Sequence, residues 1–158
     1  MNPYLVSALE MMPGLIRREF ERLSPEQVDA RPDPERFTPR EVLAHLADWE
    51  PIFLDRIRTG VTSPGSPVPV WDESQRATDN DYASKDPSDS LAIWRKARGE
   101  TVAYVRGLKP EDFAKTVEHP ERGTTTVGAL ASMMVCHDIY HLEQLASMTP
   151  QERVADVW

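Results

Sequence analysis

The stretch "TPREVLAHLADWEPIF" at residues 38–53 carries the strongest helix-start signal in the chain. Its threonine can cap a helix, its first proline suits the first helical position, and its first glutamate completes a capping box. We predict a helix from this point to about Thr59. Pro51 lies inside it and is expected to kink the helix or to open its hydrogen bonding locally.

Three more long helices are expected around this one. We place them from Asn2-Pro3 to about Leu23 with a bend at Pro13-Gly14, from Asp86-Pro87 to about Leu108, and from the "TTTV" at residues 124–127 to about Met148. A last short turn is expected to start at Thr149-Pro150. Strand signals are almost absent. Residues 60–86 form a long connection, whose first half is rich in Gly, Pro and Ser and whose length permits a crossover.

The two halves of the chain echo each other weakly. "LSPEQV" at residues 23–28 is similar to "LKPEDF" at residues 108–113, and a Pro-Glu-Arg triplet follows each. After each triplet comes a threonine-capped helix that carries histidine. We therefore interpret the chain as an all-α protein, a four-helix bundle built from two related hairpins. A chance match is the alternative.

Composition narrows the classes of function. The 158 residues suit one domain, and the net charge of −8 argues against a nucleic-acid partner. No apolar run approaches the ~20 residues of a membrane span, and the first residues lack the basic region of a signal peptide. The single cysteine excludes an internal disulfide and fits a reducing cytoplasm. We expect a cytoplasmic protein with no membrane association.

Two histidines stand four residues apart in "CHDIYHLEQL" at residues 136–145. Positions four apart share one helix face, so His137 and His141 point the same way. Apolar residues continue that face, and it is expected to point into the bundle: Leu130, Met134, Leu145 and Met148. The ring nitrogens of His137 and His141 can converge on one metal ion. Two histidines rarely suffice to bind an ion, so a third ligand is expected.

His45 is the best candidate for that ligand, because its helical phase places it beside Val42 and Trp49 on an inward face. Three neutral imidazoles from two facing helices are typical of a catalytic-type zinc or nickel site with an open fourth position. Three unrelated core histidines are the alternative. The remaining histidine, His119, lies in the "VEHPERG" turn, where we expect a solvated or turn role.

Two sharper interpretations of "HDIYH" are set aside. Asp138 would replace the glutamate of a metalloprotease helix and is one methylene too short for that base. A di-iron bundle needs Glu-x-x-His pairs, which this sequence does not contain. Cys136 precedes the first of the two histidines but points ~100° away from it. We expect it to be a buried structural thiol outside the site.

The segments "RFTPREVLAHLADWE" (residues 36–50) and "HDIYHLEQL" (residues 137–145) resemble the DinB-like (DinB/YfiT) superfamily, over nearly the whole chain. The resemblance implies a single domain over residues 1–158 with up-down-down-up connectivity. It also implies a divalent metal, zinc or nickel, on His45, His137 and His141. Phe37 departs from the family, in which many members carry Trp there.

The resemblance also implies three classes of function for a small-molecule site. The first is a thiol-dependent S-transferase that uses a low-molecular-weight thiol and attacks small electrophiles. The second is a metal-dependent hydrolase that uses a metal-bound water, and the third is a non-catalytic metal-binding module. Around the ion, Asp48 is a candidate for a supporting contact, Trp49 for a pocket wall and Tyr82 for a lid. Ordinary surface, core and loop roles are their alternatives.

A second apolar face of the last helix lies roughly opposite its histidines, and it predicts a homodimer. The face is formed by Val135, Ile139, Leu142 and Ala146. One helix of a small bundle seldom needs apolar residues on both sides. Cover by neighbouring helices or by the crossover is the alternative.

Overall fold

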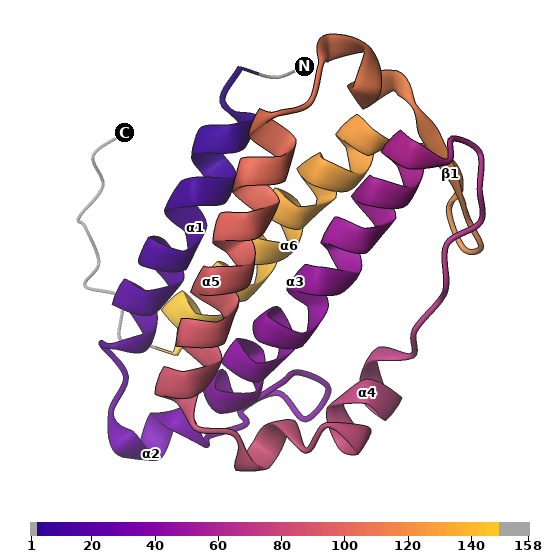
Figure 1. Cartoon of the computed structure of the whole chain (residues 1–158). Helices are drawn as coiled ribbons and strands as arrows, with labels where there is room; N and C mark the ends of the chain where they lie inside the picture. Colours follow the sequence, from indigo (N-terminus) through magenta and orange to yellow (C-terminus); the bar gives the residue numbers. More distant parts are fainter. Residues whose placement is uncertain (1–2, 149–158) are drawn as a thin grey trace, which may run out of the picture.

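The structure, a computed structural model, describes residues 3–148. Its four long helices are α1 (Leu5–Phe20), α3 (Pro39–Thr62), α5 (Pro87–Arg106) and α6 (Val127–Ser147). Helices α1 and α6 run in one direction, and α3 and α5 run in the other (Figure 1). Helix α1 contacts α5 and α6, and so does α3. The predicted four-helix bundle with up-down-down-up connectivity is confirmed.

The helix starts follow the capping chemistry of the sequence. The backbone N–H of Thr38 donates to the carboxylate of Glu41 at 2.7 Å, and the Thr38 hydroxyl accepts from the backbone N–H of Glu41. This is the predicted capping box. Asp86 caps α5, and Thr126 caps α6. Helix α3 continues through Pro51 and ends at Thr62, slightly later than predicted.

Short helical elements fill the connections, and they were not predicted. They are α2 (Pro25–Val28), α4 (Glu73–Asp79), the 3-10 turn η1 (Tyr82–Ser84) and the 3-10 turn η2 (Pro110–Ala114). Helix α4 and η1 belong to the crossover, which lies beside the lower half of α3 in Figure 1. The crossover therefore forms a wall along the bundle. The turn expected at Thr149-Pro150 lies outside the described residues.

A small antiparallel hairpin corrects the expectation that strands are almost absent. Strands β1 (Thr116–His119) and β2 (Gly123–Thr126) pair with Thr116 opposite Thr126. β-Branched residues favour strands, so the threonines after residue 123 form a strand before the last of them caps α6. The crossover also bonds to β1, because Val68 donates its N–H to the carbonyl of Glu118. Such long-range pairing leaves no local signal.

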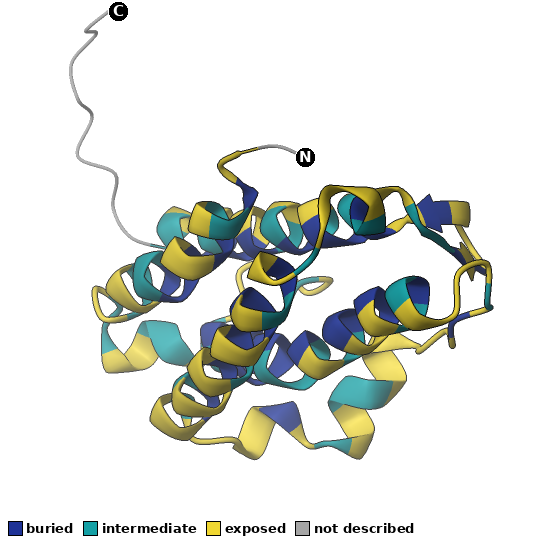
Figure 2. Cartoon of the chain, turned by 45° about the horizontal axis from the view of Figure 1, so that its top comes forward, coloured by how far each residue is buried: buried dark blue, intermediate teal, exposed yellow. Residues whose placement is uncertain are grey.

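The apolar core lies between the four long helices, whose inward faces are buried (Figure 2). One part of it includes Leu9, Phe53, Ile57, Val102, Leu130 and Met134, and another includes Ile16, Leu43, Leu46, Trp94 and Leu145. Gly60 lets the end of α3 approach the start of α6 and strand β1, since a Cβ there would lie 2.6 Å from Val127 Cγ2 and 3.2 Å from Val117 Cγ1.

Neighbouring elements cover part of the apolar face on which the homodimer was predicted. Val135 and Leu142 pack against the core, whereas Ile139 is 52% exposed. The face is therefore smaller than the sequence suggests. Within residues 3–148, no helix is both long enough and apolar enough to cross a membrane.

Candidate metal centre

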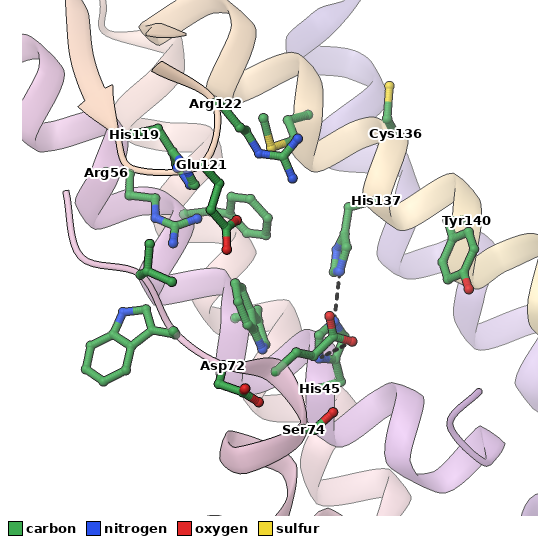
Figure 3. Close-up of a pocket in the computed structure, with 16 residues that line it drawn as sticks. His45, Arg56, Asp72, Ser74, His119, Glu121, Arg122, Cys136, His137 and Tyr140 are labelled. Atoms are coloured by element: carbon green, nitrogen blue, oxygen red, sulfur yellow. Dashed lines mark hydrogen bonds and ion pairs between the residues drawn. The ribbon is translucent and has the colours of Figure 1, made fainter. Parts of the chain in front are cut away.

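Three histidine side chains meet between α3 and α6. His45 Nε2 lies 2.8 Å from His137 Nε2, which lies 3.3 Å from His141 Nε2. The capping box of α3 sets the phase that turns His45 inward, and the four-residue spacing on α6 brings the other two rings together. The sequence placed all three side chains on inward faces, and the structure brings them to one point (Figure 3 shows two of them).

Burial keeps these imidazoles neutral at pH 7. Burial, followed by the charges of His141 and His137, holds the pKa of His45 well below its usual range. Burial lowers the pKa of His137 to about 3 and that of His141 to about 4. Neutral imidazole is the form that ligates a metal, so the ligands need not lose protons at neutral pH.

Two residues that the sequence analysis missed lie beside the ring nitrogens that face away from the meeting point of the histidines. Gln144 donates its amide to the carbonyl of Phe37, which leaves its Oε1 facing His141 Nδ1 at 3.2 Å. This contact fixes the proton on Nδ1 and leaves the Nε2 lone pair for an ion. On the other side, Glu73 Oε1 lies 3.9 Å from His45 Nδ1, which is buried and has no hydrogen-bond partner in the part of the chain that the structure describes. The three-residue spacing from His141 could have indicated Gln144, whereas nothing local indicated Glu73.

The donor set fits a divalent cation. The three ligand nitrogens lie within 4.8 Å of one another. Two ligands of a tetrahedral zinc at about 2.05 Å stand about 3.3 Å apart, which matches the separation of His137 and His141 and exceeds that of His45 and His137 by about 0.5 Å. Three neutral bases packed together, two of them buried and one half-buried, are poorly explained as ordinary core residues. The residues His45, His137 and His141 would hold the ion.

His45 and His137 open on one side into a cavity of about 720 Å³ (Figure 3). Helix α3, the crossover, the hairpin turn and α6 all contribute to its wall. Its lining includes His45, Trp49, Phe53, Arg56, Trp71, Asp72, Glu73, His119, Glu121, Arg122, Cys136, His137 and Tyr140. A cavity of this size accommodates a small molecule beside the ion position.

The three predicted supporting residues have distinct places. Trp49 lines the cavity, and its ring centroid lies 5.6 Å from that of His45. Asp48 binds Arg76 through two hydrogen bonds and accepts a third, at 2.6 Å, from the Tyr82 hydroxyl. Tyr82 is buried with its ring edge toward His45. Burial, then Asp48, raises the pKa of Tyr82. Asp48 and Tyr82 thus tie the crossover to α3, on the His45 side of the bundle.

Asp138 bonds to Arg98 and not to the histidines. It is 1% exposed and accepts two hydrogen bonds from Arg98, whose guanidinium also binds Glu50. Burial raises the pKa of Asp138 to about 6, against the opposing effect of Arg98. This placement agrees with setting aside the metalloprotease interpretation, because Asp138 belongs to a structural ion network.

Two expectations about cavity residues need correction. His119 is 4% exposed rather than solvated, although its Nδ1 does accept the N–H of Glu121 in the turn. Cys136 is exposed and lies on the cavity wall, whereas a buried thiol was expected. Its sulfur points away from His137, as the helical phase predicts (Figure 3). The hairpin causes the first difference, because it turns His119 inward at the end of β1.

Comparison with known proteins gives consistent matches. A family model described as the DinB superfamily matches residues 8–145. A "Putative metal-dependent hydrolase" of Oceanobacillus iheyensis is 26% identical over 143 residues, which are 90% of this chain and 83% of that protein. The "Putative metal-dependent hydrolase YfiT" of Bacillus subtilis is 24% identical, covering 91% and 82% respectively.

Two solved structures share the fold. The structure of YfiT from Bacillus subtilis, described as a "probable metal-dependent hydrolase with an unusual four-helix bundle topology", superposes with a TM-score of 0.85 at 24% identity. The superposition covers 91% of this chain and 83% of the YfiT chain. The mycothiol-dependent maleylpyruvate isomerase superposes with a TM-score of 0.72 at 12% identity, covering 89% of this chain and 59% of the isomerase.

Proposed function

This chain belongs to the DinB superfamily, and on that premise we propose that it binds zinc or nickel through His45, His137 and His141. The observation that carries the proposal is the meeting of three neutral ring nitrogens beside a cavity. When bound, a divalent ion supplies a Lewis acid that lowers the pKa of a coordinated thiol or water. The chain itself supplies the ligands, the contact from Gln144 that fixes the tautomer of His141, and the cavity.

The reaction proposed first is S-transfer from a low-molecular-weight thiol to a small electrophile. Its support is the fold shared with a mycothiol-dependent enzyme, together with room beside the histidines for two small reactants. In this scheme Gln144 orients His141, and the wall that includes Trp49 limits access of water. Cys136 is not the nucleophile, because its sulfur points away from His137.

Metal-dependent hydrolysis is the second candidate. It is favoured by relatives that match 90% of this chain and are named as metal-dependent hydrolases. The same ligands would serve, and water would replace the thiol as the nucleophile. A module that binds the metal without catalysis is the third candidate, which predicts metal uptake with no turnover.

One experiment separates the three candidates. Protein loaded with zinc or nickel is offered a reactive aryl halide together with bacillithiol, mycothiol, cysteine or glutathione, and activated esters and amides in separate reactions. Thiol-dependent consumption of the halide that His141→Ala abolishes and Cys136→Ser preserves supports the transferase. Turnover of esters without thiol supports the hydrolase. If metal binds and every reaction stays at the His141→Ala level, catalysis is excluded for these substrate classes.

Three broader proposals accompany the site. The protein acts in the cytoplasm as a single domain over residues 1–158, and it forms a homodimer through α6. For the dimer, the exposed apolar side chains of Ile139 and Tyr140, each 52% exposed, remain available on α6. Sedimentation at micromolar concentration should give twice the chain mass of 17.9 kDa. A sedimenting monomer would exclude the dimer.

A further inference from the structure

The end of the cavity away from His45 carries two arginines. Arg56, from the second half of α3, and Arg122, from the hairpin turn, both line the cavity together with His119 and Glu121. Figure 3 shows these four side chains grouped on one side, while Asp72 and Ser74 lie toward His45 on the other. The cavity therefore has a histidine end and an arginine end.

Arg56 is a buried cation with few partners. It is 5% exposed, and within residues 3–148 its one hydrogen bond runs from Nη2 to the carbonyl of Pro69 at 3.0 Å. Its Nε is buried and has no hydrogen-bond partner among the same residues. The rings of Trp49 and Phe53 stand 5.9 and 6.0 Å from its guanidinium carbon, which compensates only part of the lost hydration. Buried arginines are normally paired, so this guanidinium has unused donors.

Arg122 brings a second positive charge toward the same place. Gly123 follows it with a φ of +68°, and the N–H of Arg122 bonds to the carbonyl of His119, which closes the turn beside the cavity. Burial, followed by the charge of Arg122, lowers the pKa of Arg56, and Glu121 opposes this shift. Within residues 3–148, neither guanidinium has a carboxylate oxygen within 4.0 Å.

We propose that Arg56 and Arg122 form a carboxylate-binding subsite, which holds an anionic group of a reactant whose reacting atom lies at the three histidines. The charges at the arginine end favour a carboxylate, since two guanidiniums and the carboxylate of Glu121 leave one net positive charge there when His119 is neutral, whereas Asp72 and Glu73 line the histidine end. Guanidinium donors match a carboxylate in geometry as well as in charge. The inference rests on the proposed function, because it assigns one end of the reactant to the metal end of the cavity.

The carboxylate can belong to the electrophile or to the thiol, and paired probes distinguish these sources. One pair is 4-chloro-3-nitrobenzoate and its amide, and the other is 3-mercaptopropionate and its amide. Binding to metal-free protein is measured by calorimetry and by the indole N–H resonances of Trp49 and Trp71, which line the cavity. Metal-free protein keeps this test independent of metal uptake and of turnover.

Three variants distinguish a loss of binding from a loss of folding. Arg122→Gln changes an exposed turn residue, and Arg56→Gln tests the buried partner. Arg18→Gln, on the exposed side of α1, removes the same charge away from the cavity and is the matched control. Charge-assisted hydrogen bonds predict that at least one acid binds wild type about 10-fold or more tighter than its amide. Arg122→Gln and Arg56→Gln should remove this preference, and Arg18→Gln should keep it.

The outcomes also separate this subsite from the metal proposal. The acid that shows the preference identifies which reactant carries the carboxylate. Equal binding of acid and amide in both pairs, or equal losses in Arg122→Gln and Arg18→Gln, would overturn the subsite. Elemental analysis should show unchanged metal content in Arg122→Gln. If wild type binds no metal but still prefers the acids, the metal proposal fails while the carboxylate subsite stands.

Discussion

Two buried arginines of the same bundle have opposite surroundings. Arg98 on α5 is 2% exposed, and its guanidinium donates to Glu50, to Asp138 and to the carbonyl of Leu9. Arg56 on α3 is 5% exposed, and in the described part of the chain its guanidinium donates only to the carbonyl of Pro69. The first therefore ties four helices together, whereas the second lines a cavity with unused donors.

The difference distinguishes a buried charge that is paired within the protein from one whose donors are free to bind a ligand. Burying an ion costs several kcal/mol, and the protein offsets this cost only when partners satisfy its hydrogen-bonding groups. The carboxylates of Glu50 and Asp138 do so for Arg98. For Arg56 the missing partner has to come from outside the chain. The comparison predicts unequal costs for removing the two side chains.

The largest expected effect is on the stability of Arg98→Met. This change leaves Glu50 and Asp138 buried without their cation, which costs ~3–5 kcal/mol in the free energy of unfolding. Arg56→Met, the matched change, loses one neutral hydrogen-bond partner and costs about 1 kcal/mol. Urea denaturation followed by circular dichroism measures both free energies. Equal costs for the two variants would break the comparison.

The same distinction applies to the histidines, and metal affinity measures it. His137→Ala removes one of the three proposed ligands and should weaken zinc binding by more than about 100-fold. Loss of a residue that only bonds to a ligand weakens metal binding by about 10–100-fold. His119→Ala should leave the affinity unchanged, because its Nδ1 is used by the turn at Glu121. Competition with a chromophoric chelator gives the two constants. Similar losses in both variants would count against a site made by His45, His137 and His141.

A smaller effect on the metal is expected from Gln144→Leu. The variant keeps all three ligands but removes the contact that fixes the tautomer of His141. Loss of such an outer partner lowers metal affinity about 10–100-fold. Gln75→Leu on α4 is the control, since its amide bonds only to Asp79 in the described chain. The orienting role would be refuted if zinc bound Gln144→Leu as tightly as it binds the control.

The sequence predicted what depends on local periodicity and capping, and it missed what depends on long-range contacts. The capping box at Thr38 and the spacing of His137 and His141 set helix phase, so the three histidines could be placed on facing sides. Arg56 and Arg122 lie 66 positions apart in the sequence, and only the hairpin and the crossover bring them to one cavity. The residue type alone does not distinguish Arg56 from Arg98, because both are arginines on amphipathic helices.

The smallest expected effect tests how firmly the crossover wall is held. The hydroxyl of Tyr82 donates to Asp48 at 2.6 Å, and Asp48 keeps its two bonds to Arg76 when that hydroxyl is absent. Tyr82→Phe should therefore lower the free energy of unfolding by about 1 kcal/mol. Tyr140→Phe, at a site that is 52% exposed, should change it by less than about 0.5 kcal/mol. Hydrogen exchange should also quicken in residues 73–84 of Tyr82→Phe and remain slow in α5, because the lost bond anchors only the crossover. Faster exchange across the whole bundle would instead show that this hydroxyl stabilises the bundle as a whole and not only the crossover.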